Sequence, residues 1–179
     1  MIETEVDSIR VSLVTQARVV ILKEVSGERH LPIWIGPFEA ESIAMELQGV
    51  SASRPLPYDL IRAVVTEMGG EIRRVLVTEL TQDVFYARIV IDRAGVAFEI
   101  DSRPSDAIAV AVRAKIPILV EESVMDRAGV RLDDASDVDA DAEVSGAPGE
   151  QPVSEERLSA FKDFIDSLDL DDFGTKREN

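Results

Sequence analysis

Cysteine is absent from the 179-residue chain, and histidine occurs once, as His30. Without cysteine the chain can form no disulfide, no thiolate zinc site and no cysteine nucleophile. One histidine argues against catalytic pairs or zinc sites built from several histidines. Aromatic residues make up 5% of the chain, and its single tryptophan, Trp34, lacks the aromatic and basic neighbours of a base-stacking platform. Carboxylates and arginines remain as the candidates for chemistry.

Long apolar runs are also absent, since none approaches the ~20 residues that a membrane-spanning helix needs. The first five residues, Met1 to Glu5, have neither the basic region nor the apolar core of a secretory signal. We therefore expect a soluble, cytoplasmic protein without a membrane partner.

Positive charge is scarce, because 19 Lys and Arg stand against 35 Asp and Glu, a formal net charge of −16. Residues 1–130 hold 20 acids and 14 bases, a net charge of −6, whereas residues 131–179 hold 15 acids and 5 bases, a net charge of −10. The chain is 45% hydrophobic, so we expect one folded domain over residues 1–130. Residues 131–153 alternate acids with small residues, which predicts a disordered acidic linker that cannot bury enough apolar surface to offset the entropy of ordering.

The last segment, residues 154–179, begins with a helix start. Ser154 precedes two acids that would fall in the first turn, where the helix dipole favours negative charge. Apolar residues then follow at helical spacing: Leu158, Phe161, Phe164, Ile165 and Leu168. We predict a short amphipathic helix that docks on its own domain or on a partner, because helices this short are marginal unless docked.

The folded part alternates β-rich runs with helical patterns. About seven strands are predicted, in an α+β domain whose sheet is mostly antiparallel or mixed. Three inserted helices are predicted over residues 38–48, 57–68 and 104–114, with one further helical turn over residues 121–127. We interpret His30, which precedes a strand, as a surface or edge residue.

Two of these helices begin with similar segments. Arg54-Pro55-Leu56-Pro57-Tyr58-Asp59 and Arg103-Pro104-Ser105-Asp106 each place proline at the start and aspartate near the third helical position. An aspartate there can reach back to free backbone N–H groups, so both segments can be plain helix caps. In the functional alternative, Arg54 and Arg103 clamp a phosphodiester beside Ser105, because a helix amino terminus and a planar guanidinium both favour phosphate oxygens.

Carboxylates near these starts are candidate ligands for Mg²⁺ or Mn²⁺, which prefer oxygen. The candidates are Glu39, Glu46, Asp101 and Asp106. Glu39 and Glu46 are seven residues apart in the first predicted helix and therefore lie nearly on one face. The alternative is a solvated helix edge, with Glu39 stabilising the first turn through the helix dipole. The spacing leaves both interpretations open.

Four separated motifs resemble segments of one family, the bifunctional nuclease domain, in the expected order over about residues 1–130. They are Leu31-Pro32-Ile33-Trp34-Ile35-Gly36-Pro37-Phe38-Glu39-Ala40, Arg54-Pro55-Leu56-Pro57-Tyr58-Asp59-Leu60, Phe85-Tyr86-Ala87-Arg88-Ile89 and Ile100-Asp101-Ser102-Arg103-Pro104-Ser105-Asp106-Ala107-Ile108-Ala109. The resemblance implies activity on both DNA and RNA. The family often has histidine where Tyr58 stands, so a general base at this position would be missing, whereas a mechanism based on carboxylates and a metal would survive.

Three functions therefore stand at this stage. The first is a metal-dependent nuclease in which Asp59 and Asp106 are catalytic, while Arg54 and Arg103 hold the substrate and also take part in catalysis by stabilising the transition state. A net charge of −6 gives the domain no general attraction for nucleic acid, and the acidic tail could compete with it for a basic patch. The second is a non-catalytic regulatory module that self-associates, as a homodimer or higher oligomer, through a sheet edge. The third is binding of a small phosphorylated ligand at the helix starts, without hydrolysis.

Overall fold

The computed structural model describes residues 1–12 and 16–131, so the predicted tail helix and all but the first residue of the predicted linker lie outside the described residues. The described strands are β1 (Ile2–Val11), β2 (Arg18–Glu24), β3 (Arg29–Ile35), β4 (Glu71–Thr81), β5 (Val84–Arg93), β6 (Val96–Ser102), β7 (Ile118–Val120) and β8 (Val130–Arg131). The described helices are α1 (Pro37–Leu47), α2 (Pro57–Glu67), α3 (Pro104–Ala114) and α4 (Glu122–Ala128).

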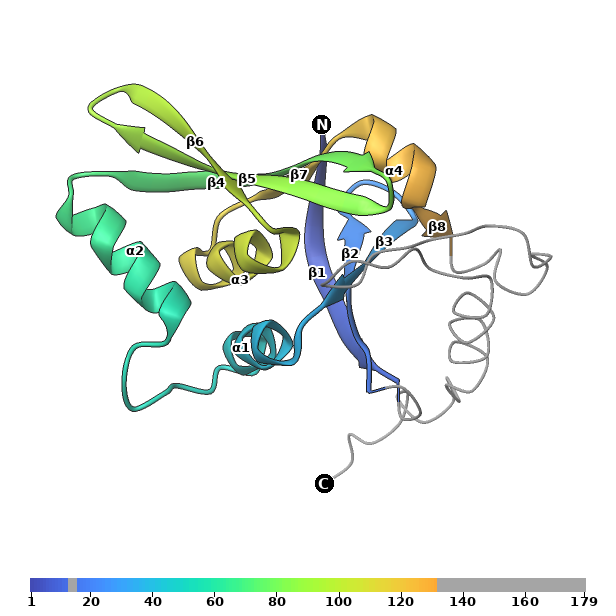
Figure 1. Ribbon diagram of the computed structural model, residues 1–179, viewed down its shortest axis with the longest axis horizontal. Helices are drawn as coiled ribbons and strands as arrows, with labels where there is room; N and C mark the ends of the chain where they lie inside the picture. Colours follow the sequence, from blue (N-terminus) through green and yellow to red (C-terminus); the bar gives the residue numbers. More distant parts are fainter. Residues whose placement is uncertain (13–15, 132–179) are drawn as a thin grey trace.

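These strands form a single sheet in the order β6-β5-β4-β7-β1-β2-β3-β8 (Figure 1). Two antiparallel meanders, β1-β2-β3 and β4-β5-β6, are joined by β7, which pairs parallel with β4 and antiparallel with β1. The α+β class with a mixed sheet is thereby confirmed. The two-residue β8 was not predicted, and α4 forms where one helical turn was expected.

Helices α1, α2 and α3 lie on the same side of the sheet (Figure 1). Strand alternation directs Val75 and Val77 of β4 toward this side, where they are fully buried in the core. Helix α3 packs centrally because small side chains such as Ala107 and Ala111, both fully buried, allow a close approach to the strands. Each end of α3 therefore reaches neighbouring helices, which sets the geometry of the candidate site.

The interpretation of His30 as a surface or edge residue is wrong. His30 lies inside β3 and is buried, opposite Lys23 of β2 and Val130 of β8. Among the described residues its Nδ1 finds no hydrogen-bond partner. The prediction failed because β8 is too short to give a sequence pattern, and this strand makes β3 an inner strand of the sheet.

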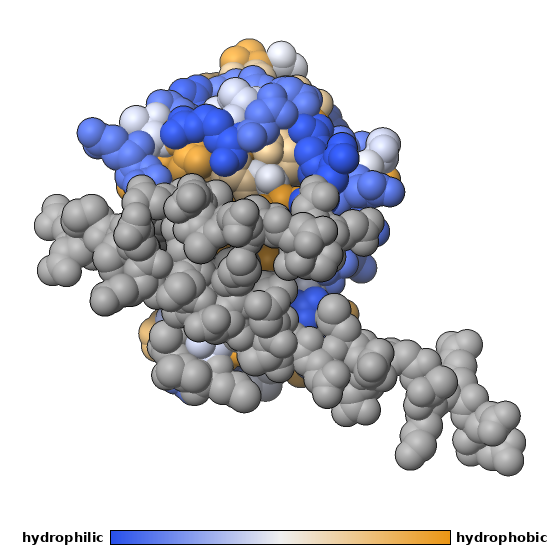
Figure 2. Space-filling model, turned by 90° about the vertical axis from the view of Figure 1, so that its right-hand side faces the viewer, coloured by the Kyte–Doolittle hydropathy of each residue, from blue (hydrophilic) through white to orange (hydrophobic). Residues whose placement is uncertain are grey.

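The end of the molecule that carries α4 and β8 is rich in ion pairs. Arg29 donates to Glu24 at 2.9 Å, to Glu122 at 3.0 Å and to Asp126 at 3.0 Å. Outside the grey atoms this end presents mostly hydrophilic side chains (Figure 2). In the part of the chain that the structure describes, no helix is both long and apolar enough to cross a membrane.

Candidate functional site

Arg103, immediately before α3, holds two carboxylates from two helices. Its Nε donates to Asp106 Oδ2 at 2.7 Å, and its Nη2 donates to Asp106 Oδ1 at 3.0 Å and to Glu39 Oε1 at 2.7 Å. The Arg103 side chain is nevertheless 60% exposed, and its Nη1 donates to none of the described residues. The guanidinium is thus fixed in place while two of its N–H groups remain for an incoming anion.

Tyr58, in the first turn of α2, brings a third helix to the same point. Its hydroxyl donates to Asp106 Oδ1 at 3.0 Å. Burial, followed by the hydrogen bond to Asp106, raises the pKa of Tyr58 well above its usual range. The phenol therefore stays protonated and acts as a donor, not as a base. We call Glu39, Tyr58, Arg103 and Asp106 the Arg103 cluster.

The position of Glu39 depends on the residue before α1. Gly36 is the N-cap of this helix, and Glu39 lies in the first turn with its side chain 11% exposed. A Cβ atom at Gly36 would overlap Glu39 Oε2, so a side chain there would displace the carboxylate. The Gly36-Pro37 pair, which the sequence predicts as a helix start, thus also makes room for the carboxylate that reaches Arg103.

A second cluster lies at the other end of α3, around Arg113. Arg113 Nη1 donates to both oxygens of Asp59 at 3.0 Å and lies 3.8 Å from Glu46 Oε2. Its Nε and Nη2 donate to Ser42 Oγ at 3.2 and 3.0 Å, and Nη2 also donates to the Ser42 carbonyl at 3.0 Å. With 7% of its side chain exposed, Arg113 ties α3 to both α1 and α2. We call Ser42, Glu46, Asp59 and Arg113 the Arg113 cluster.

Asp59 has a structural role at the start of α2 as well. Its Oδ2 accepts the Leu56 backbone N–H at 2.8 Å, as expected for the third residue of a capped helix. Partial burial would raise the pKa of Asp59, but the Leu56 N–H and the Arg113 guanidinium outweigh it, so the pKa lies below its usual value. Asp59 is therefore a paired, ionised carboxylate within the helix layer.

The structure separates the residues that the sequence grouped together. Glu39, Arg103 and Asp106 meet, whereas Glu46 and Asp59 belong to the Arg113 cluster. Ser105 is buried in the first turn of α3. Arg54 is exposed in the segment before α2 and makes no hydrogen bond or ion pair to any described residue.

Asp101 lies apart from both clusters. It is opposite Arg88 of β5 in the sheet, whereas the next residue pair, Ser102 and Ala87, faces the helices. Because successive strand residues point to opposite faces, the Asp101 side chain is on the face that carries no helix from α1 to α3. Arg113 is the residue that motif reasoning missed. The signal was a charged residue directly after the small and apolar run over residues 107–112 of α3.

The carboxylates of the described residues do not by themselves fit a metal centre. Within residues 1–12 and 16–131, no group of three or more histidine, aspartate or glutamate residues could hold a metal ion. Moreover, Glu39 and Asp106 already accept hydrogen bonds from Arg103. We therefore assign no chemical step to a metal, and the expected Mg²⁺ or Mn²⁺ dependence stays a prediction.

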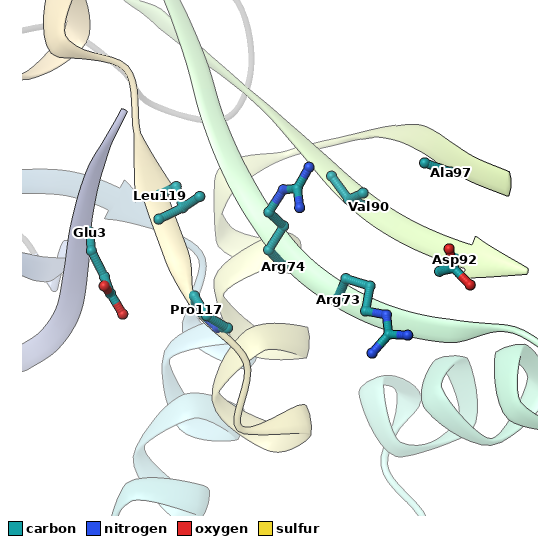
Figure 3. A pocket seen from close by; sticks show the side chains of 8 residues that line it. All are labelled: Glu3, Arg73, Arg74, Val90, Asp92, Ala97, Pro117 and Leu119. Carbon is teal, nitrogen blue, oxygen red and sulfur yellow. The ribbon is translucent and has the colours of Figure 1, made fainter. Parts of the chain in front are cut away.

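A separate hollow of about 460 Å³ lies on the opposite face of the sheet (Figure 3). It is lined by Glu3, Arg73, Arg74, Val90, Asp92, Ala97, Pro117 and Leu119. Arg73 also pairs with Glu71 at 2.6 Å. Two acids and two bases line this hollow, so its lining has no single sign of charge that would favour a phosphate backbone.

Known proteins resemble this chain over the region that contains both clusters. An uncharacterized protein of Mycobacterium tuberculosis is 40% identical over 171 residues, which cover 96% of this chain and 97% of the relative. Bifunctional nuclease 1 of Arabidopsis thaliana is 32% identical over 118 residues, which cover 64% of this chain and 36% of the plant protein. Bifunctional nuclease 2 of Oryza sativa subsp. japonica is 30% identical over 119 residues, which cover 65% of this chain and 37% of the rice protein.

The two plant proteins are therefore much longer than the part that matches, whereas the mycobacterial relative matches along nearly its whole length. The family model of the bifunctional nuclease domain matches residues 20–133. This range contains α1, α2 and α3 with every member of the Arg103 and Arg113 clusters. The chain belongs to the bifunctional nuclease domain family.

Proposed function

We propose that the chain hydrolyses phosphodiester bonds in DNA or RNA, and that the Arg103 cluster is the reaction centre. The observation that carries this proposal is an exposed guanidinium held by Glu39 and Asp106, with Nη1 unused by the described residues. A pre-positioned arginine can bind two phosphate oxygens and stabilise the charge that develops on them without reorganising during the reaction. The names of the plant relatives support the same reaction class.

In this mechanism Arg103 Nη1 binds the scissile phosphate and Asp106 accepts the proton of the attacking water. A water oxygen bonds to phosphorus, one P–O ester bond breaks, and the leaving oxygen takes up a proton from bulk water, to which Asp106 later returns the proton that it accepted. An ionised carboxylate has about four acceptor positions, so Asp106 retains capacity beyond its bonds to Arg103 and Tyr58. Protonated Tyr58 then keeps the carboxylate oriented.

Other candidate residues receive lesser roles in this proposal. Arg54 is exposed in the segment that leads into α2, and it extends the substrate contact along the nucleic-acid backbone. Asp59 has a sufficient structural account in its bonds to Leu56 and Arg113, so the mechanism does not use it. The experiment compares DNA with RNA and tests the metal dependence.

The decisive experiment measures cleavage of single-stranded DNA and RNA by the wild type, Asp106→Asn and Arg103→Met. Each reaction is run with Mg²⁺, with Mn²⁺ and with EDTA. Removing one group that stabilises a transition state typically lowers kcat by about 10²–10³-fold, and we expect losses of this size for both variants. The Arg103→Met variant should lose about 1–2 kcal/mol of its free energy of unfolding, because Arg103 is mostly exposed but Glu39, 11% exposed, loses its donor.

The matched control is Asp126→Asn, which removes a carboxylate that pairs with Arg29 at 3.0 Å at the other end of the molecule. This variant should cleave like the wild type. Equal cleavage by Asp106→Asn and the wild type would place the activity elsewhere or in a contaminant. No cleavage by any sample would favour a non-catalytic module.

A further inference from the structure

Helix α2 leaves its apolar stripe uncovered. Leu60, Ile61, Val64 and Met68 recur at helical spacing, yet they are between 39% and 62% exposed. A surface helix normally turns such a stripe toward the core. In α2, Tyr58 is the buried residue and Val65 is partly buried against the core, so the rest of the stripe faces outward.

Strand β6 is uncovered in the same way. It lies at the end of the sheet and pairs with β5 on one side, so its other edge has backbone N–H and C=O groups free of any described strand. Val96, Phe98 and Ile100 are between 47% and 55% exposed. Ile100 lies opposite the buried Ile89, which places this row on the face that carries α1, α2 and α3.

The two exposed rows are linked through Val65 of α2 and Ile91 of β5. A Cβ atom placed on Gly70 would lie 3.1 Å from both Val65 Cγ1 of α2 and Ile91 Cγ2 of β5, so these two side chains approach each other beside Gly70. Ile91 in turn lies opposite Phe98 of β6. Figure 1 shows α2 and the β5–β6 hairpin at the same end of the molecule. We call this the α2–β6 surface, made of Leu60, Ile61, Val64, Met68, Val96, Phe98 and Ile100.

We propose that the α2–β6 surface binds a second copy of this chain, with β6 antiparallel to β6 of the partner copy. A two-fold axis perpendicular to the sheet relates two antiparallel neighbouring strands. It keeps the helix-bearing faces of both copies on the same side. Each α2 then flanks the seam, and the two apolar helix stripes cover the apolar rows of the paired β6 strands. One arrangement thus pairs the free edge and buries both rows.

The size of the surface fits this partner. From the exposures, and with about 200 Å² for a fully exposed large apolar residue, the seven residues expose on the order of 700 Å² per copy. This exceeds the largest apolar patch on many monomers, about 300–600 Å². Two such surfaces, together with the strand edges, reach the roughly 1,200–2,000 Å² buried in stable complexes.

Charge also favours self-association. The row on β6 that faces the second copy's helices has no charged residue among Val96, Phe98 and Ile100. The acids of β6, Glu99 and Asp101, lie on the opposite face. There Arg88 donates to Glu99 at 2.6 Å. Pairing two β6 strands therefore does not bring an unneutralised Glu99 against its equivalent.

The first test is the mass of the full chain in solution, measured by sedimentation over a range of concentrations. We expect a dimer of the 19.6 kDa chain. Val64→Lys and Phe98→Lys should each raise the dissociation constant at least 100-fold, because each buries a charge without a partner. Val25→Lys is the matched control, since Val25 is 53% exposed outside the α2–β6 surface, and its dimer should persist. A monomeric wild type would overturn the proposal.

The second test uses the absence of cysteine, because a single introduced cysteine can cross-link only to another copy. Glu99→Cys lies at the centre of β6, and we expect a short bismaleimide to join two chains through it. Val25→Cys should give no such product. Strong cross-linking at position 25 without any at position 99 would assign the dimer to a different surface.

The remaining occupant to distinguish is the chain's own tail, whose apolar residues include Phe161. If the tail covered the α2–β6 surface, the full chain would be a monomer, and Phe161→Lys would release the surface and produce a dimer. That outcome would overturn the proposal in favour of the tail. A dimer whose dissociation constant is the same with and without Phe161→Lys supports the second copy.

Discussion

The starts of α2 and α3 have nearly the same sequence pattern but different surroundings. At α2, Asp59 accepts the Leu56 N–H and pairs with the buried Arg113, while Arg54 contacts no described polar partner. At α3, Arg103 itself bonds to Asp106 and Glu39 and remains exposed. The same motif therefore supports structure at one helix and leaves a charged group available for chemistry at the other.

The difference arises from the partners that the fold supplies. Arg113 has 7% of its side chain exposed and Arg103 has 60%, although both are arginines that bind carboxylates from neighbouring helices. Removing one member of a buried ion pair strongly destabilises a protein, whereas an exposed pair contributes little to stability. Stability and activity should therefore respond in opposite ways to changes in the two clusters.

The largest expected effect follows from Arg113→Met. The variant keeps the approximate volume but leaves Asp59, Glu46 and the polar groups of Ser42 without their donor. We expect the free energy of unfolding, measured by urea denaturation, to fall by about 3–5 kcal/mol.

Arg103→Met is the matched control for this change, with a smaller stability loss of about 1–2 kcal/mol and a large loss of cleavage. If Arg113→Met proved as stable as the wild type, the Arg113 cluster would not be the cluster that stabilises the fold. If the two variants lost equal stability, the contrast between the clusters would disappear.

The sequence predicts the helices of this site well, because proline starts and helical spacing are local signals. Asp59 caps α2 as its position predicts. Helical periodicity places Glu39 and Glu46 on one face of α1, but it does not show that they contact different arginines. Seven residues return to one face of α1 but advance about 10 Å along its axis, so Glu39 reaches Arg103 while Glu46 approaches Arg113.

Contacts between distant segments account for what the sequence could not supply. The bond from Tyr58 to Asp106 joins residues 48 positions apart, and the bond from Arg113 to Ser42 joins residues 71 apart. The helical spacing of α2 gives its apolar stripe but not the direction in which that stripe faces. Strand alternation places Asp101 and Ile100 on opposite faces of β6. The sequence does not show which of these faces the helices cover, so it could not separate Asp101 from the site.

The second prediction concerns acid stability, through Asp59. Its pKa is lowered in the folded chain, so its ion pair stabilises the fold fully above the unfolded pKa, about 3.9. That stabilisation is lost as the pH falls through the lower, folded pKa. At neutral pH, Asp59→Asn should lower the free energy of unfolding by about 1–3 kcal/mol, because Arg113 then faces a neutral amide.

The measurement is urea denaturation of Asp59→Asn and the wild type at several pH values between 2 and 7. Glu24, whose pKa is lowered by its hydrogen bond from Arg29, loses stabilisation in the same acid range in both proteins. The informative quantity is therefore the difference in the free energy of unfolding between Asp59→Asn and the wild type, which should shrink in acid. A difference that stays constant down to pH 2 would show that Asp59 acts without its charge.

The smallest expected effect is that of Tyr58→Phe, which removes one hydroxyl from the Arg103 cluster. Asp106 would keep its two bonds from Arg103, so its orientation is weakened but not lost. We expect kcat to fall two- to tenfold with KM unchanged, and stability to change by about 1 kcal/mol, the usual contribution of one hydrogen bond. Steady-state cleavage kinetics measure the first, and urea denaturation the second.

Tyr58→His adds a test of the position itself, because the family often has histidine there. A histidine can donate to Asp106 as the phenol does, and it can also titrate near neutral pH, whereas the pKa of a tyrosine is already far above neutral and that of Tyr58 is raised further. If Tyr58 only orients Asp106, Tyr58→His should cleave at least as fast as Tyr58→Phe. A loss of 100-fold or more in Tyr58→Phe would instead make the phenol a proton donor to the leaving oxygen, and α2 would then supply chemistry as well as support.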